Sequence, residues 1–277
     1  MTTSTKPNPF FLYGTAWKEE ETAPLTRLAI ESGFRGVDTA NQRKHYFEAA
    51  VGEAISRAID DGLVTRDELF LQTKFTYLAG QDHRLPYDKD ASFSAQVEQS
   101  FASSLKHLQT DYVDSYVLHG PSTRVGLTDA DWEVWAKMEE LKTSGQTRAI
   151  GVSNISAEQL HLLIDNAAIL PAFVQNRCYA RTGWDQYVRQ LCDEHDIVYQ
   201  GFSLLTANVG ALQSDLLSSL AQQYDRTIPQ IVFRFSIDVG MLPITGTTDQ
   251  NHMTQDLSSF EFQLTDEEVR AIEAVEG

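Results

Sequence analysis

Four side chains in the first 120 residues have the types needed to move a proton onto a substrate oxygen: Asp38, Tyr46, Lys74 and His119. A tyrosine hydroxyl has a pKa of about 10 and donates its proton poorly at neutral pH unless a cation stabilises the phenolate. Lys74 could supply that cation, and Asp38 could supply the anion that a charged lysine needs in a water-poor site. His119 could then hydrogen-bond the substrate oxygen and hold it against the tyrosine.

The elements that would position these side chains alternate along the whole chain. Short segments rich in apolar residues predict eight strands, at 11–15, 36–40, 69–74, 113–119, 149–153, 173–176, 198–203 and 241–245. Helical patterns occupy the intervals, at about 22–32, 46–61, 93–108, 129–144, 156–167, 184–195, 213–224 and 228–238, with late helices near 251–257 and 265–276. Ser156 and Thr265 each precede a Gln or Glu by three residues, which indicates capping boxes at two helix starts.

Eight strand–helix units in 277 residues predict an α/β protein with a (β/α)8 TIM barrel. No linker rich in Pro, Gly or Ser divides the chain, so residues 1–277 are expected to form a single barrel domain. A doubly wound dinucleotide-binding sheet is the competing architecture. It needs Gly-x-Gly-x-x-Gly after the first strand, and the segment 11–17 contains no such run. In a barrel the active site lies at the carboxyl ends of the strands, where the four polar residues are predicted to stand.

The composition argues against several classes of partner. The chain has 22 Lys and Arg against 39 Asp and Glu, a net charge of −17, and no basic cluster, so nucleic acid is not expected to bind. The longest apolar run, at about 167–174, is far shorter than the roughly 20 residues that span a bilayer, so no membrane contact is expected. Two cysteines and no apolar leader predict a cytoplasmic protein. Neither the cysteines nor the seven histidines have metal-ligand spacing, so no catalytic metal is expected.

Four segments resemble the signature segments of the aldo-keto reductases in their order and approximate spacing: Phe34-Arg-Gly-Val-Asp-Thr-Ala40, Gln72-Thr-Lys-Phe75, Asp114-Ser-Tyr-Val-Leu-His119 and Ala149-Ile-Gly-Val-Ser-Asn154. The resemblance extends from Gly14-Thr-Ala-Trp17 to Phe260-Glu-Phe-Gln-Leu264. It implies a (β/α)8 barrel that reduces carbonyl compounds with a nicotinamide cofactor. The family's catalytic Asp, Tyr, Lys and His would fall on Asp38, Tyr46, Lys74 and His119, and Trp17 would contact the substrate.

The same resemblance implies a set of cofactor contacts. Ser153, Asn154 and Gln175 match the residues that hold the nicotinamide carboxamide. Phe202 stands where the family usually has a tyrosine that stacks on the nicotinamide, and stacking needs only the ring face. The positions that would follow the pyrophosphate and the adenosine are Ser203, Leu205, Thr245, Gly246, Thr247, His252, Gln255 and Asp256. The helix that begins near Thr248 would offer backbone amides to a phosphate.

The sequence departs from the family pattern around two of these sites. Tyr46 follows Asp38 by eight residues, which is more than the usual spacing, so 41–45 contains an insertion. Ile244 and His252 replace a lysine and an arginine that often bind the 2′-phosphate of NADPH. A charge-assisted hydrogen bond contributes about 1.5–3 kcal/mol. We therefore expect only a modest preference for NADPH over NADH, which strengthens as His252 gains a proton at lower pH.

These observations predict an NADPH-dependent reductase of aldehydes or ketones in which Tyr46 donates the proton. NADPH is the expected cofactor with NAD as an alternative, the partner is a small-molecule carbonyl substrate, and the chain is expected to be a monomer or a weak homodimer. The chain stops at Gly277 without the long C-terminal loop that covers substrate in many members, so we expect an open pocket. Two other functions remain open: a non-catalytic barrel that binds a nicotinamide nucleotide as a regulatory ligand, and a lyase or isomerase that forms a Schiff base through Lys74.

Overall fold

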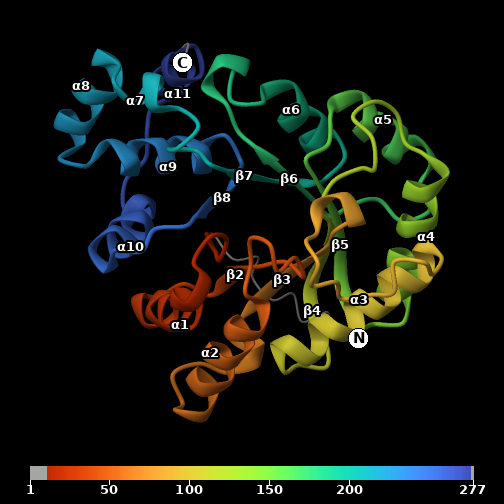
Figure 1. Ribbon diagram of the computed structural model, residues 1–277. Coiled ribbons are helices and arrows are strands. Elements are labelled where there is room, and N and C mark those ends of the chain that lie inside the picture. Colours follow the sequence, from red (N-terminus) through yellow and green to blue (C-terminus); the bar gives the residue numbers. More distant parts are fainter. Residues whose placement is uncertain (1–10, 276–277) are drawn as a thin grey trace, which may run out of the picture.

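Parallel strands close into one barrel in a computed structural model that describes residues 11–275 (Figure 1). Residues 1–10 of the predicted domain, and residues 276–277 at the end of the predicted last helix, lie outside the described residues. The strands are β1 (Leu12–Gly14), β2 (Gly36–Asp38), β3 (Phe70–Phe75), β4 (Val113–Leu118), β5 (Thr147–Ser153), β6 (Phe173–Arg177), β7 (Val198–Phe202) and β8 (Leu242–Thr245). Neighbours in the barrel follow chain order, and β1 pairs with both β2 and β8. The predicted (β/α)8 barrel is confirmed.

Helices follow the strands and pack around the outside of the barrel (Figure 1). They are α1 (Thr22–Ser32), α2 (Glu48–Asp60), α3 (Phe93–Leu108), α4 (Asp129–Thr143), α5 (Ala157–Asn166), α6 (Gln186–Glu194), α7 (Val209–Leu212), α8 (Asp215–Tyr224), α9 (Ile228–Asp238), α10 (Gln250–Leu257) and α11 (Asp266–Glu273). Both predicted capping boxes form, at Ser156 before α5 and at Thr265 before α11. Sequence analysis missed α7, because a single turn of four residues leaves no helical periodicity to detect.

The barrel interior is filled in layers, because inward-facing residues of a strand are two positions apart. An apolar cluster inside the barrel contains Leu12, Phe70, Phe173 and Leu242, and it continues along β8 to Ile244, which lines the cavity. The next residues along the strands form a hydrogen-bonded polar layer of Asp38, Gln72, Gln175 and Gln200. Above it stand Lys74, Arg177 and Phe202, two residues after Gln72, Gln175 and Gln200 respectively. The polar layer thus lies between the apolar residues at the lower end of the barrel and the mouth of the barrel.

Both cysteines are buried free thiols, Cys178 just after β6 and Cys192 on α6. Burial raises the pKa of each thiol to about 12. At neutral pH both sulfurs therefore carry their protons.

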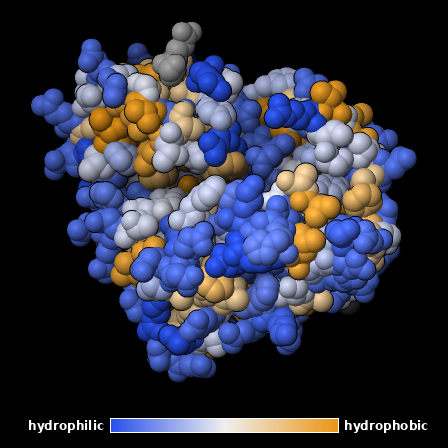
Figure 2. All heavy atoms as spheres, in the orientation of Figure 1, coloured by the Kyte–Doolittle hydropathy of each residue, from blue (hydrophilic) through white to orange (hydrophobic). Residues whose placement is uncertain are grey.

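The face shown in Figure 2 is mainly hydrophilic with small apolar groups scattered over it, in keeping with a net charge of −17. No helix within residues 11–275 has the length and apolar character to span a bilayer. Trp17 is an exposed aromatic side chain, 71% accessible, and it stands at the edge of the cavity described next.

Candidate active site

A cavity of about 950 Å³ opens at the carboxyl ends of the strands, near the upper end of the range of about 300–1,000 Å³ found for ligand pockets. All the residues that sequence analysis assigned to the site except Lys74 line it: Trp17, Asp38, Tyr46, His119, Ser153, Asn154, Gln175, Phe202, Ser203, Leu205, Thr245, Gly246, Thr247, His252, Gln255 and Asp256. Lys74 is fully buried and reaches the site through its contact with Asp38. The fold thus brings together side chains that are more than 200 residues apart in the sequence.

Asp38 and Lys74 form a buried ion pair. Lys74 Nζ lies 2.7 Å from each carboxylate oxygen of Asp38 and 2.8 Å from the backbone oxygen of Thr39. Burial lowers the pKa of the Lys74 ammonium, and the Asp38 carboxylate opposes that shift. All three ammonium protons are directed at these oxygens. This geometry disfavours the Schiff-base alternative, because an attacking amine needs a free electron pair and access to the substrate.

Tyr46 lies beside this ion pair and lines the cavity. Lys74 Nζ is 5.2 Å from the centroid of its ring, and the ring of His119 meets it edge-on at a centroid distance of 5.8 Å. Burial, and then the charge of Asp38, raises the pKa of Tyr46. The expected lowering of this pKa by Lys74 is not found, since the ammonium protons are donated to Asp38 and Thr39. Tyr46 is therefore a weak acid that gives up its proton only to a strong base formed beside it.

His119 is a neutral imidazole. Burial, followed by the nearby charge of Lys74, lowers its pKa to about 3. Its Nδ1 lies 2.7 Å from the hydroxyl oxygen of Thr76. When that hydroxyl donates to Nδ1, the single ring proton is on Nε2, where it can be donated to a substrate oxygen. His119 can thus orient a substrate without changing its own charge near neutral pH.

The ends of β5 and β6 present two side-chain oxygens to the cavity. Asn154 Nδ2 donates to the backbone oxygen of His119 at 2.8 Å and to Ser153 Oγ at 3.1 Å. Gln175 Nε2 donates to Asp38 Oδ1 at 3.0 Å and to Gln200 Oε1 at 2.9 Å. Because both amide nitrogens are used within the protein, Asn154 Oδ1 and Gln175 Oε1 are the atoms left to accept hydrogen bonds from a ligand. Two acceptors match the two N–H donors of a carboxamide.

Trp17 and His45 cover one side of the mouth. Their rings stack with centroids 3.9 Å apart and an interplanar angle of 34°, and the Trp17 amide donates to the backbone oxygen of His45 at 2.7 Å. Sequence analysis selected Trp17 but missed His45, which lies in the insertion 41–45. The sequence did contain a signal for this residue, because an additional histidine stands one position before Tyr46.

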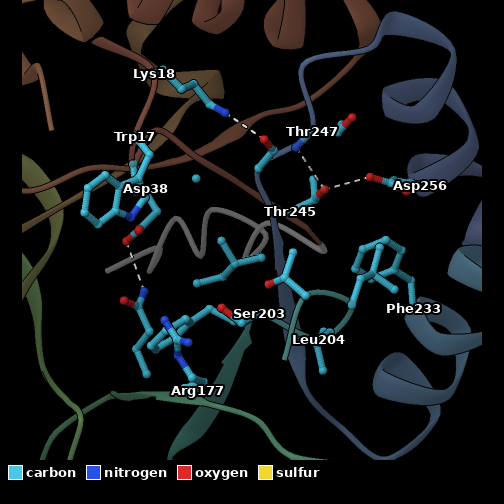
Figure 3. A pocket seen from close by; sticks show the side chains of 18 of the residues that line it. Trp17, Lys18, Asp38, Arg177, Ser203, Leu204, Phe233, Thr245, Thr247 and Asp256 are labelled. Carbon is cyan, nitrogen blue, oxygen red and sulfur yellow. Dashed lines mark hydrogen bonds between the residues drawn. The ribbon is translucent and has the colours of Figure 1, made fainter. Parts of the chain in front are cut away.

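Sequence analysis also missed two cations of the cavity wall. Lys18 Nζ donates to the backbone oxygen of Gly246 at 2.7 Å, and burial lowers its pKa to about 8 (Figure 3). Arg177 ends β6, and its guanidinium carbon is 5.6 Å from the centroid of the Phe202 ring. Neither cation forms a salt bridge with a carboxylate within residues 11–275. Both therefore remain available to an anionic ligand.

The far end of the cavity is formed by β8 and α10. Thr245 Oγ1 donates to Asp256 Oδ2 at 2.8 Å (Figure 3), and burial raises the pKa of Asp256 to about 7. Asp249 caps α10 by accepting the His252 amide at 3.0 Å. That amide is occupied, so the phosphate site expected at this helix start has one donor fewer than sequence analysis assumed.

The lining fits a nicotinamide dinucleotide in its chemistry. The ends of β5 and β6 offer the two carboxamide acceptors, and β7 offers the Phe202 ring. Lys18, which follows β1, supplies a positive charge beside Gly246, and β8 and α10 supply polar side chains. A dinucleotide presents an amide on a flat ring, two phosphates and a polar purine. Each of these groups thus has a chemically matching partner in the cavity wall.

Comparisons with known proteins agree with this geometry. The model of the Aldo/keto reductase family matches residues 10–276. Aldo-keto reductase AKR2E4 of Bombyx mori is 35% identical over 266 residues, which cover 91% of this chain and 82% of that protein. Methylglyoxal reductase DkgA of Yersinia pestis is 31% identical over 253 residues, which cover 91% and 83%. The crystal structure of the Bombyx mori protein in complex with NADP has a TM-score of 0.78 at 30% identity, covering 96% of this chain and 88% of that one.

Proposed function

Because this chain belongs to the aldo/keto reductase family of NAD(P)H-dependent oxidoreductases, we propose that it reduces an aldehyde or ketone with NADPH and that Tyr46 donates the proton. The observation that carries the proposal is the arrangement at the cavity. The ring of Tyr46 lies 5.8 Å from that of neutral His119, with the Asp38–Lys74 ion pair behind it. A proton donor and an orienting group thus line the cavity, and a cation lies behind the ring of the donor.

The residues that would hold the cofactor follow from the cavity lining. Asn154 and Gln175 would accept the carboxamide N–H groups, Phe202 would contact the ring face, and Lys18 would neutralise a phosphate. The bound dinucleotide supplies a hydride for the carbonyl carbon. The chain's own task is to place the carbonyl and to manage the proton.

Proton delivery is the task of Tyr46. Hydride addition to the carbonyl carbon leaves the oxygen negatively charged, and an alkoxide is more basic than a phenolate. The raised pKa of Tyr46 is therefore no obstacle to transfer of its proton to that oxygen, which completes the alcohol. His119 Nε2 holds the oxygen in place, and the phenolate left on Tyr46 faces the ammonium of Lys74 until it recovers a proton from water.

Turnover is tested with a panel of aldehydes and ketones while the absorbance of NADPH or NADH is followed. We expect loss of reduced cofactor with at least one small carbonyl compound, and alcohol as the product. Tight binding of the cofactor without turnover over the whole panel would contradict the proposal and favour the regulatory barrel.

Affinity for NADPH is expected to increase as the pH falls from 8 to 6. The Asp256 carboxyl has a pKa of about 7, so it is mostly ionised at pH 8 and mostly neutral at pH 6. A neutral carboxyl does not repel a phosphate. We expect the dissociation constant to fall by about two- to fivefold, which is less than the 1.4 kcal/mol of a tenfold change. Titration of the protein with NADPH at both pH values measures it.

Two variants separate Asp256 from His252 in this pH effect. Asp256→Asn should remove the part of the pH dependence that NADPH and NADH share, since its amide does not titrate. His252→Gln should remove only a part confined to NADPH, as expected if this imidazole contacts the 2′-phosphate. An unchanged pH dependence in Asp256→Asn would contradict the assignment.

A further inference from the structure

In the polar layer inside the barrel, each hydrogen bond has a defined donor and a defined acceptor, and these assignments are mutually consistent. Gln72 Nε2 donates to Asp38 Oδ1 at 2.7 Å and to Gln200 Oε1 at 2.8 Å. Gln200 Nε2 donates back to Gln72 Oε1 at 3.0 Å. Gln175 Nε2 donates to Asp38 Oδ1 at 3.0 Å and to Gln200 Oε1 at 2.9 Å. The three glutamines are 0–4% exposed, so water cannot easily replace these bonds.

The charge of Asp38 sets these assignments. An ionised carboxylate only accepts hydrogen bonds, so Gln72 and Gln175 must each turn their NH₂ group toward it. The second proton of each NH₂ group then goes to Gln200 Oε1, and Gln200 must in turn direct its own NH₂ group at Gln72. A flip of any one amide would place two oxygens, or two N–H groups, against each other in a site with little water. A buried polar group left unmatched in this way destabilises the flipped arrangement.

One acceptor atom of the network, Gln175 Oε1, remains able to bind a ligand in the cavity. Both protons of Gln175 Nε2 are used within the layer, whereas no donor within residues 11–275 reaches its Oε1. Gln175 lines the cavity, and its Oε1 is not among the buried polar atoms that lack a partner. The layer therefore presents a fixed acceptor at the mouth and excludes a donor there.

We propose that Gln72 and Gln200 are positioning residues that, together with ionised Asp38, lock the Gln175 amide as an acceptor for the amino group of the nicotinamide carboxamide. The assignment rests on the proposed function. It couples the ion pair behind Tyr46 to the pose of the cofactor, because the same Asp38 Oδ1 receives Lys74, Gln72 and Gln175. Neither Gln72 nor Gln200 lines the cavity, so they act on a ligand through the lining residues Asp38 and Gln175.

Two nucleotides that differ only in one hydrogen-bond donor group test whether the orientation of the Gln175 amide is fixed. NADP⁺ carries the carboxamide, and its 3-acetylpyridine analogue replaces the NH₂ group by a methyl group. Calorimetric titration gives the ratio of their dissociation constants. In the wild type we expect at least about tenfold tighter binding of NADP⁺, as for a buried acceptor left unpaired by the analogue. Gln200→Met and Gln72→Met should each reduce this ratio by about threefold or more.

Gln96→Met is the matched control, because Gln96 is equally buried but bonds to Lys89 and Ala91 oxygens beside α3, away from the cavity. It should lower the melting temperature without changing the ratio.

If the barrel glutamines only fill space, their variants will weaken the binding of both nucleotides equally, and an unchanged ratio overturns the assignment. Asp38→Asn, a nearly isosteric change, provides a second test should either methionine variant fold poorly, and it should also reduce the ratio. A wild type that binds neither nucleotide would overturn the proposed function and this assignment together, whereas a variant-independent ratio would overturn only the assignment.

Discussion

Tyr46→Phe is expected to lower kcat by about two to four orders of magnitude, the range typical of a general acid. The change removes one oxygen atom and leaves the ring beside His119 and Lys74 in place. No contact to the cofactor is lost, so the affinity for NADPH should stay within about twofold of the wild type. This corresponds to a change of less than about 0.6 kcal/mol in the free energy of binding. Steady-state kinetics with the best carbonyl substrate and a cofactor titration measure the two quantities.

Tyr77→Phe is the control for this result. Its hydroxyl donates to Asp131 at 2.9 Å and does not line the cavity, so the variant should keep turnover near that of the wild type. Wild-type turnover in Tyr46→Phe, with a large loss in Tyr77→Phe, would transfer the role of proton donor to Tyr77.

Lys74→Met is expected to lower the free energy of unfolding by about 3–5 kcal/mol and to abolish most turnover. The change leaves the Asp38 carboxylate buried without its cation, although Gln72 and Gln175 still donate to it. Urea unfolding measures the change in free energy, and steady-state kinetics measure the loss of turnover.

The double variant Asp38→Asn/Lys74→Met separates stability from activity. It removes both charges, so much of the lost free energy of unfolding should return, while turnover should not. Equal stability of the single and the double variant would show that the cost of Lys74→Met is lost packing rather than an unpaired charge.

The barrel could be predicted from the sequence because each strand and helix is specified by local residue patterns. Apolar runs of strand length and capping residues such as Ser156 and Thr265 mark the elements, and the structure places them within a few residues of the predicted bounds. The second strand ends at Asp38 rather than at residue 40, and the Thr39 carbonyl accepts a hydrogen bond from the Lys74 side chain. Such a tertiary contact has no local signal.

The site was less predictable than the fold, since its electrostatics depend on burial and on distant neighbours. Desolvation of the partly buried Tyr46 raises its pKa, which residue types alone suggested would fall. Gln72 and Gln200 are 128 residues apart and read simply as members of two strands, so their pairing could not be predicted without the barrel register. The proposed cytoplasmic location and the monomer or weak homodimer stay predictions.

The two buried thiols bear on the chemical durability that the proposed reduction of aldehydes would require. Aldehydes are electrophiles, and the thiolate form of cysteine is the reactive nucleophile toward them. With the pKa of both thiols at about 12 and both sulfurs enclosed, Cys178 and Cys192 offer almost no thiolate at neutral pH. These are the only cysteines in the chain. An electrophilic substrate would therefore find no accessible cysteine thiol, and loss of activity over many turnovers would have to arise from other side chains.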